Sequence, residues 1–492
     1  MNLYQKYQHN SVPTVVHIIL CILALGFWLL FASIALPFLF IFNVFKWSVA
    51  AWILYNRIGK LVASEDVPYM HESEHNKNYN VCLFMVKGEP DVEKLRNLFN
   101  ERVVKNEGHP SYQRLRQRIH RKYGRYVWAD EMDFDISRHI HHYLGNPPAD
   151  DEELEKLFGE IISKPLSQDL SPWQVVVIPL KIEGRFAFFT RAHHIIGDGI
   201  SMVNLFSKVM DDKPVLLKPS EKLIKKYQSS ALRRVFHGLL NGPLCLLAIA
   251  LSLPNNPFPR TTDKKGEQKV AWSEAISLSK IKEVKTNIGA TINDVVTGCL
   301  AGAVRRYINT TKGECSEDLQ IAVSINTRHP SVLMKENIPL ENNATGVILN
   351  LPVTGETVLD RINQSKQRMD AIKSSSDFLV FGFIFNHVVA KVPEFVGRLT
   401  VNSLNRHCSL ILSNVPGPLN KMVIGGDEVE SIMVWPPLIG GIGMATAIFS
   451  YADTLRLNIK ADTSVFSNPK LLVEYFHEEV DTLFKIYAKK ED

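Results

Sequence analysis

An uncharged apolar run near the N-terminus places the strongest constraint on how this chain can fold. From Val12 to Phe45 the sequence contains no Asp, Glu, Lys or Arg and consists mainly of Leu, Ile, Phe, Val and Ala. A helix needs about 20 such residues to cross the hydrocarbon core of a bilayer, and residues 14–36 satisfy that length. A cleaved signal peptide would have a shorter apolar stretch and a small-residue cleavage site. Residues 1–60 are therefore predicted to form an uncleaved membrane anchor with a transmembrane helix over 14–36.

The apolar pattern continues after a proline. Pro37 is expected to break or kink the first helix because it has no backbone N–H to donate. Residues 38–55 remain apolar, with Lys46 as their only charge. Their aromatic residues suit the headgroup region, which favours an interfacial segment over a second short span or a re-entrant hairpin.

The flanking charges predict the orientation of the anchor. Lys46, Arg57 and Lys60 follow the uncharged apolar run, whereas Lys6 is the only Lys or Arg before it. By the positive-inside tendency, the main body is expected in the cytoplasm. The six cysteines are far apart and form no CxxC pair, which is typical of reduced thiols and agrees with that side.

A second constraining stretch is a strand that runs into a cluster of histidines and glycines. Residues 185–192 are rich in aromatic residues and are followed by His193-His194-Ile195-Ile196-Gly197-Asp198-Gly199. Because successive side chains of a strand point to opposite faces, His193 and His194 are not expected to serve one site. Gly197 and Gly199 are expected to allow backbone angles that a Cβ would obstruct, and Asp198 to fix the loop or an imidazole.

The spacing alone leaves the chemistry of this cluster open. A neutral imidazole can take a proton from a hydroxyl or thiol near neutral pH, which makes one histidine a candidate general base. A buried structural histidine pair is the plain alternative. Two ligands of a metal site that is completed elsewhere would fit as well.

The rest of the chain predicts two α/β halves and a connection. At 492 residues it exceeds what one core usually supports, and strands alternate with helices in residues 68–210 and again in 266–488. Residues 211–265 form the predicted linker, within which 236–253 are mostly apolar but interrupted by Gly, Asn and Pro. We expect a membrane-dipping or lid-like segment there, with a buried crossover as the alternative.

Three further clusters carry possible chemistry. Asn293 or Asp294 is predicted to cap a helix that extends to Tyr307. The basic window 114–125 would contact anionic lipid headgroups or CoA phosphates, or be a solvated face paired with nearby acidic residues such as Asp130, Glu131 and Asp133. His139 and His141 would share a strand face and could bind a metal, although plain surface or core histidines are preferred. The formal net charge of +5 over 492 residues is well below the basic charge typical of nucleic-acid-binding proteins. We therefore expect no nucleic acid as a partner.

Taken together, these segments resemble the wax ester synthase/diacylglycerol acyltransferase family of the CoA-dependent acyltransferase superfamily. Residues 193–199 resemble the HHxxxDG motif of that superfamily. Ordered similarities to other family motifs lie at Trp128 with Asp133-Phe134-Asp135 and His139, at 165–173, at 290–296 and at 413–418. Ser167 stands where the family usually has Asp.

The resemblance implies a fold and a mechanism. Two similar mixed-sheet α/β domains would enclose a channel, with acyl-CoA entering from one side and an alcohol from the other. His194 would be the general base, with His193 supporting it and Asp198 in a structural role. Gly199, Asn293 and Asp294 would lie at the substrates. Acyl-CoA is then a co-substrate, and no cofactor or metal is expected.

The acceptor and the membrane remain the open parts of this prediction. A long-chain alcohol would give a wax ester and a diacylglycerol would give triacylglycerol, at a membrane that we expect to be the endoplasmic reticulum. The long acyl chain and the predicted anchor fit that setting. The alternatives are an acyltransferase for a different acceptor and a catalytically idle, membrane-anchored lipid-binding protein on the same fold.

Overall fold

The computed structural model describes residues 14–72, 77–106, 109–221, 224–225, 231–252, 254, 256–258, 267–375 and 377–487. The polar N-terminus, parts of the predicted linker 211–265, and residues 266 and 488 at the ends of the predicted second half lie outside these ranges.

The first half is built on a six-stranded mixed sheet in the order β13-β14-β2-β7-β6-β5. All neighbours are antiparallel except β5 and β6. The strands of this sheet are β2 (Tyr79–Lys87), β5 (Ile140–His142), β6 (Trp173–Pro179), β7 (Arg185–His193), β13 (Val423–Ile424) and β14 (Asp427–Trp435).

Both faces of this sheet are buried, which explains the unbroken apolar run in β7. Phe186 and Phe188 pack on one side with helices α3 (Val92–Phe99) and α5 (Gly199–Val209). Ala187 and Phe189 pack on the other side with α4 (Asp151–Ile162). The predicted hairpin of β6 and β7 is confirmed, as is the helix that follows the histidine motif.

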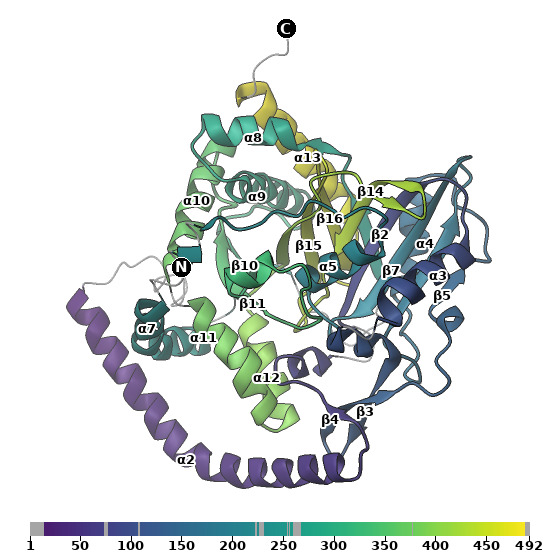
Figure 1. The fold of residues 1–492 in the computed structure, drawn as a ribbon. Helices are drawn as coiled ribbons and strands as arrows, with labels where there is room; N and C mark the ends of the chain where they lie inside the picture. The colour runs from purple at the N-terminus through teal and green to yellow at the C-terminus, as the bar shows by residue number, and fades with distance from the viewer. Residues whose placement is uncertain are drawn as a thin grey trace.

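The second half contains a seven-stranded mixed sheet in the order β11-β10-β12-β15-β16-β8, with β9 beside β16. Helices α8, α9, α10 and α13 pack against it around one apolar core (Figure 1). Its strands are β8 (Gln268–Trp272), β9 (Ile276–Ser277), β10 (Leu319–Asn326), β11 (Ala344–Leu351), β12 (Ile411–Pro416), β15 (Met444–Tyr451) and β16 (Thr454–Asp462). Its helices are α8 (Leu278–Asn287), α9 (Ile292–Thr311), α10 (Val358–Ser374) and α13 (Pro469–Tyr487).

The second half contributes two strands to the sheet of the first half. Strands β13 and β14 belong to the second half in sequence but complete the first sheet, where β14 pairs with β2. A third, three-stranded sheet joins β1 (Lys60–Leu61), β4 (Arg125–Asp130) and β3 (Gln117–Lys122). The predicted domains 68–210 and 266–488 are thus tied together by a shared sheet.

Short helical turns connect these elements. The 3-10 turns are η1 (Val67–Met70), η3 (Pro110–Arg116), η4 (Ile136–Arg138), η5 (Pro330–Met334) and η7 (Val389–Lys391). Two π-helical turns, η2 (Asn100–Val104) and η6 (Ile384–Val388), each continue from a preceding α-helix.

The N-terminal apolar run forms one continuous helix, α2 (Thr14–Tyr55). The helix continues through Pro37, so of the two expected outcomes the break does not occur. The other expected outcome, a kinked helix, agrees with the change of direction that α2 shows along its length (Figure 1). The predicted boundary between a 14–36 span and a 38–55 segment is therefore not a boundary of secondary structure. By length and composition, α2 over Val15–Tyr55 and α7 over Leu232–Leu251 are both candidates to cross a membrane.

Helix α7 (Ala231–Leu251) occupies the predicted apolar linker segment 236–253. Cys245, Ala248 and Ile249 are buried in the core of the second half, as the crossover alternative required. The N-terminal part of α7 exposes apolar side chains such as Phe236 and Leu239. Contact of this part of the helix with a membrane stays a prediction.

Residues 377–405 form a helical segment that we call the wall. It consists of α11 (Asp377–Phe383), η6, η7 and α12 (Glu394–Asn405), and it was not predicted. In Figure 1 the wall lies beside α7, on the side of the body along which α2 runs.

Candidate active site

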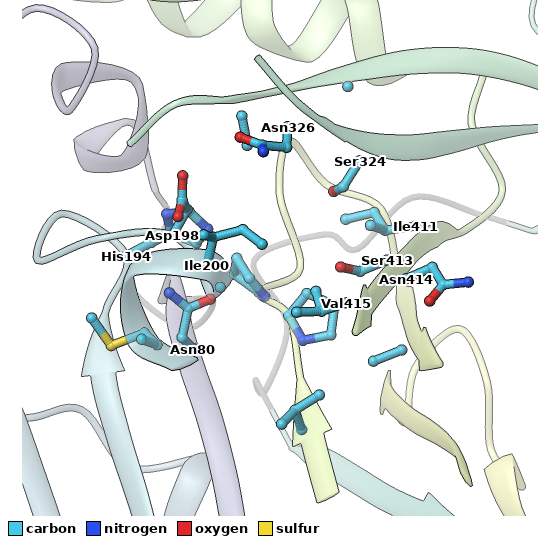
Figure 2. Close-up of a pocket in the computed structure, with 18 of the residues that line it drawn as sticks. Asn80, His194, Asp198, Ile200, Ser324, Asn326, Ile411, Ser413, Asn414 and Val415 are labelled. Atoms are coloured by element: carbon cyan, nitrogen blue, oxygen red, sulfur yellow. The ribbon is translucent and has the colours of Figure 1, made fainter. Parts of the chain in front are cut away.

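A cavity of about 230 Å³ lies between the two halves. One water occupies roughly 30 Å³ in the liquid, so this space suits an organic ligand. Figure 2 shows His194 and Asp198 on one side of it, facing Ser324, Asn326, Ser413 and Asn414 on the other. The remaining lining is mostly apolar and comes from β2, α5, β10, β11, β12, β15 and the wall.

The two motif histidines point to opposite faces, as predicted. His193 is the last residue of β7, and its Nε2 lies 3.0 Å from a carboxylate oxygen of Glu72. Its Nδ1 accepts a hydrogen bond from the backbone N–H of Ile195. His194 follows the strand and lines the cavity, whereas His193 does not. His193 therefore contacts the histidine loop on the side away from the cavity.

A hydrogen-bond chain fixes which nitrogen of His194 carries the proton. Its Nδ1 lies 2.8 Å from Oδ1 of Asn342. The amide nitrogen of Asn342 faces two groups that only accept, a carboxylate oxygen of Asp66 at 2.8 Å and the backbone carbonyl of His194 at 2.8 Å. Oδ1 must then be the acceptor from Nδ1–H. The lone pair of Nε2 is left free, and no protein group hydrogen-bonds to it within the described part of the chain.

Asp66 is anchored in turn by Arg114. Arg114 Nη2 lies 2.7 Å from the Asp66 carboxylate, and its Nη1 donates to the carbonyl oxygens of Ile195 and Ile196 in the histidine loop. The guanidinium also lies 5.4 Å from the ring centre of Trp128. Burial of Asp66 raises its pKa to about 6 despite the pairing with Arg114.

The surroundings of His194 keep it neutral. Burial lowers its pKa to about 4, and the charge of Asp198 offsets only part of that effect. Tyr69 stacks on the imidazole with ring centres 4.0 Å apart and planes 7° apart. Tyr69 in turn contacts Phe385 of the wall, at 5.5 Å between ring centres. A neutral ring with a free Nε2 can accept a proton inside the cavity.

The carboxylate of Asp198 is held by backbone and side-chain contacts on both of its oxygens. Its side chain accepts from the backbone N–H of Ser201 and so caps α5. Its other carboxylate oxygen pairs with Arg328 Nη1 at 2.6 Å and accepts from the N–H of Asn343 at 2.9 Å. Arg328 and Asn343 belong to the second half, so Asp198 joins the loop of the histidine motif to the opposite domain.

Close packing explains Gly197, whereas the structure leaves room for a Cβ at Gly199. Neither Gly197 nor Gly199 has a positive φ, so the expected role of their conformational freedom was wrong. A Cβ on Gly197 would lie 2.9 Å from Cβ of Ser201, too close for two side chains. Gly199 lines the cavity, where a Cβ would meet only Val415 at 3.5 Å.

The helix cap at α9 differs from the prediction. Thr291 is the N-cap, and Asp294 completes a capping box by accepting from the Thr291 N–H and hydroxyl. The assignment of the cap to Asn293 or Asp294 was therefore wrong. Asp294 is buried behind the cavity rather than in it. Asn293 is exposed and reaches the cavity only through Asn414, whose amide donates to it.

The second histidine cluster is structural. His139 is fully buried, stacks between Phe134 and Trp173, and has Nε2 3.0 Å from Glu131. Within the described ranges, no group of three or more His, Cys, Asp or Glu side chains is arranged to hold a metal ion. Ser167 lies in an exposed loop, where its hydroxyl accepts from the N–H of Asp169.

The basic window also has a structural part. Its arginines pair with Asp66, Asp169 and Glu394 rather than with the predicted acidic partners. Arg114 donates to carbonyl oxygens of the histidine loop, a role that was not predicted.

Comparison with known proteins identifies the family of this chain. The family model described as the wax ester synthase/diacylglycerol acyltransferase catalytic domain matches residues 65–248. The model described as the WS/DGAT C-terminal domain matches residues 340–484. Together the two matches cover about two thirds of the chain. This chain belongs to the wax ester synthase/diacylglycerol acyltransferase family.

Relatives and solved structures agree with the family. The O-acyltransferase WSD of Acinetobacter baylyi is 21% identical over 394 residues, covering 74% of this chain and 84% of the relative. The wax ester synthase/diacylglycerol acyltransferase of Marinobacter aquaeolei VT8 has a TM-score of 0.59 at 17% identity and covers 87% of this chain and 100% of that one. The first condensation domain of the CDA synthetase has a TM-score of 0.55 at 12% identity, over 88% and 97%. The predicted family, the two-domain α/β fold and the acyltransferase class are confirmed.

The wax ester synthase/diacylglycerol acyltransferase motifs do not name all of the residues that build this site. Tyr69, Asp66, Arg328 and Asn342 were not predicted. Two of them had a visible signal, since Arg328 follows the predicted strand 319–325 and Asn342 precedes the predicted strand 346–353. Polar residues in loops at strand ends are frequent in binding and catalytic sites. Only the fold, however, brings Asn342 to His194 and Arg328 to Asp198.

Proposed function

We propose that this protein is a membrane-bound O-acyltransferase that transfers a fatty acyl group from acyl-CoA to a hydrophobic alcohol, with His194 as general base. Long-chain alcohols and diacylglycerols are the acceptor classes, which give wax esters and triacylglycerol. The observation that carries the proposal is the free Nε2 of a neutral His194 inside a mostly apolar cavity between the two halves.

The chemistry follows from that nitrogen. Nε2 takes the hydroxyl proton as the alcohol oxygen attacks the thioester carbonyl carbon, and a tetrahedral intermediate forms. The C–S bond then breaks, the new ester is released, and the imidazolium gives its proton to the CoA thiolate. Asn342 accepts the Nδ1–H bond throughout, so the ring keeps its orientation in both protonation states. No acyl-enzyme is required.

The apolar lining supports the choice of hydrophobic substrates. Each buried CH₂ contributes about 0.8 kcal/mol, so a long acyl chain gains much of its binding energy from such a surface. The same chains keep both the acceptor and the product in a bilayer. The apolar helix α2 supports a membrane location, for which we propose the cytoplasmic side of the endoplasmic reticulum.

Product formation in membranes tests the proposal. Membranes that contain the full-length protein receive labelled palmitoyl-CoA with hexadecanol and dioleoylglycerol together. Wild type should form labelled wax ester, triacylglycerol or both, and His194→Ala should lose about 10²- to 10⁴-fold of that rate. His142→Ala, on a half-buried histidine outside the cavity, is the matched control.

The opposite result has a defined meaning. If wild type and His194→Ala form the same trace of product at equal amounts of folded protein, the proposal that His194 is the general base for acyl transfer is wrong. Retained binding of labelled acyl-CoA in that case would favour the lipid-binding alternative.

A further inference from the structure

Helix α2 contacts the body of the protein near its start, in its second half and at its end. Near its start, His17 Nε2 lies 2.9 Å from Asn241 Oδ1 of α7, and Trp28 donates to the carbonyl of Pro243 at 3.0 Å. Further along, Asn43 donates to the carbonyl of Lys391 in the wall at 2.9 Å. The neighbouring Lys46 donates to the adjacent wall carbonyl, that of Ala390, at 2.6 Å.

The far end of α2 is held as well. Trp52 packs edge-on against Tyr123, at the tip of the hairpin of β3 and β4, with ring centres 5.3 Å apart. Measured along its bent axis, a helix of 42 residues is about 63 Å long, twice the roughly 30 Å of a hydrocarbon core. Because its start, middle and end all contact one body, α2 runs along the surface of that body. A bilayer that contacts the exposed sides of both parts of the bent helix would lie along this surface.

The surface next to α2 suits a bilayer in both apolarity and charge. Lys46 is the only charged residue of α2, and apolar side chains of the helix such as Leu30 and Phe40 are exposed. Cations gather where the helix ends, at exposed Arg57, Lys60 and Lys122. An apolar strip that ends in cations matches a membrane with anionic headgroups.

The wall has one face toward this surface and one toward the catalytic cavity. Phe383, Phe395 and Leu399 are 62%, 73% and 64% exposed. Phe381, Phe385, Val401 and Leu404, from the same elements, line the cavity. Phe385 touches Tyr69, which stacks on His194. One layer of helix therefore separates the exposed apolar surface from the general base.

We propose that α2, the exposed part of α7 and the outer face of the wall lie in one bilayer leaflet, and that the lipid acceptor reaches His194 from that leaflet through the wall. In this arrangement α2 is an in-plane helix and does not cross the membrane. The inference rests on the proposed function and adds the route by which its acceptor arrives.

The test compares an acceptor that partitions into lipid with one that dissolves in water. The full-length protein is bound to vesicles of phosphatidylcholine and phosphatidylserine, and ester formation from palmitoyl-CoA is measured with hexadecanol and with 1-hexanol. The variants are Phe395→Glu combined with Leu399→Glu, and separately Phe383→Glu on a different element. Ile486→Glu, at an exposed position near the end of α13, is the matched control, because α13 lies far from the wall.

The wall variants should lose at least about tenfold of the hexadecanol rate, because a carboxylate is strongly unfavourable in lipid. Their 1-hexanol rate should stay near wild type, and Phe395→Leu with Leu399→Phe should restore the hexadecanol rate. Equal hexadecanol rates in wild type and both wall variants would overturn the inference while leaving acyl transfer intact. Absence of ester from wild type with either alcohol would instead refute the proposed function.

An N-terminal tag tests the in-plane position independently. In sealed vesicles with the body outside, a protease should remove the tag without detergent. Protection of the tag until detergent is added would show that α2 crosses the bilayer and would refute this part of the inference.

Discussion

Replacing Asn342 by leucine tests how far the base strength of His194 depends on the orientation of its ring. The Asn342 side chain accepts a hydrogen bond from Nδ1–H of His194 and donates hydrogen bonds to Asp66 and to the His194 carbonyl. Each of the three donor–acceptor distances is 2.8 Å. Leucine has a similar size but can neither accept nor donate. The substitution therefore removes all three hydrogen bonds together.

Two effects set the expected magnitude. One hydrogen bond that supports the transition state is worth about 0.5–1.5 kcal/mol, roughly 2- to 13-fold in rate. A proton on the wrong ring nitrogen costs far more, about 10⁴-fold when the orienting carboxylate of a Ser-His-Asp triad becomes an amide. We expect kcat to fall by roughly 10²- to 10⁴-fold. The buried Asp66 carboxylate loses a donor, which should lower the free energy of unfolding by about 1–3 kcal/mol.

The assay measures kcat and KM on vesicles with palmitoyl-CoA and hexadecanol. Asn343→Leu is the matched control, because Asn343 contacts Asp198 through its backbone N–H rather than its side chain. Asn342→Asp adds a pH readout. A carboxylate beside Nδ1 should stabilise the imidazolium and raise the His194 pKa from about 4, which moves the acid limb of kcat/KM upward by about one pH unit or more.

Two results would refute this reasoning. The first is a kcat of Asn342→Leu within about threefold of wild type, since the tautomer would then not depend on Asn342. The second is an unchanged acid limb in Asn342→Asp, because a carboxylate at Nδ1 that leaves the titration of the base unaltered cannot be in contact with it.

Further predictions concern stability and pH. Arg328→Met leaves the Asp198 carboxylate buried without its ion pair and should lower the free energy of unfolding by about 3–5 kcal/mol in urea titrations; a loss below 1 kcal/mol would contradict the pairing. His139→Ala should cost about 2–4 kcal/mol in the same titrations, yet leave kcat of the folded fraction unchanged, because His139 lies outside the cavity. The lowered pKa of His194 means that protonation favours the unfolded chain between its ordinary pKa of about 6.5 and about 4. On acidification through that window, wild type should lose up to roughly 3 kcal/mol relative to His194→Gln, and parallel curves for the two proteins would refute the lowered pKa.

The sequence predicted the elements that carry a strong local pattern. The aromatic run 185–192 formed a strand, and the alternation of faces correctly placed His193 and His194 on opposite sides. The apolar stripe of 469–487 formed the closing helix. Asp198 was expected to fix its loop or an imidazole, and the structure shows that its carboxylate is the N-cap of α5, which was not predicted.

The missed features depend on contacts that no local pattern encodes. Arg328 and Asn342 reach the motif from segments more than 100 residues away, and Asp66 lies between the apolar helix and the first sheet. The wall is apolar on two faces, one toward the cavity and one exposed, so it shows no single helical stripe.

The local errors also have physical reasons. In Thr291-Ile292-Asn293-Asp294 three residues can cap a helix, and the capping box selects Thr291 because Asp294 then bonds back to it. Pro37 removes one backbone donor, but the apolar turns on either side of it still form helix. The helix therefore continues through Pro37 instead of ending there.

The most direct test of the account is the single-turnover rate of ester formation by wild type and by His194→Gln, measured together with the Kd of palmitoyl-CoA. The account predicts an unchanged Kd and a chemical step that is slower by roughly 10²- to 10⁴-fold, because glutamine fills the site but cannot take the alcohol proton. A chemical step within about twofold of wild type at the same Kd would contradict the claim that His194 is the general base.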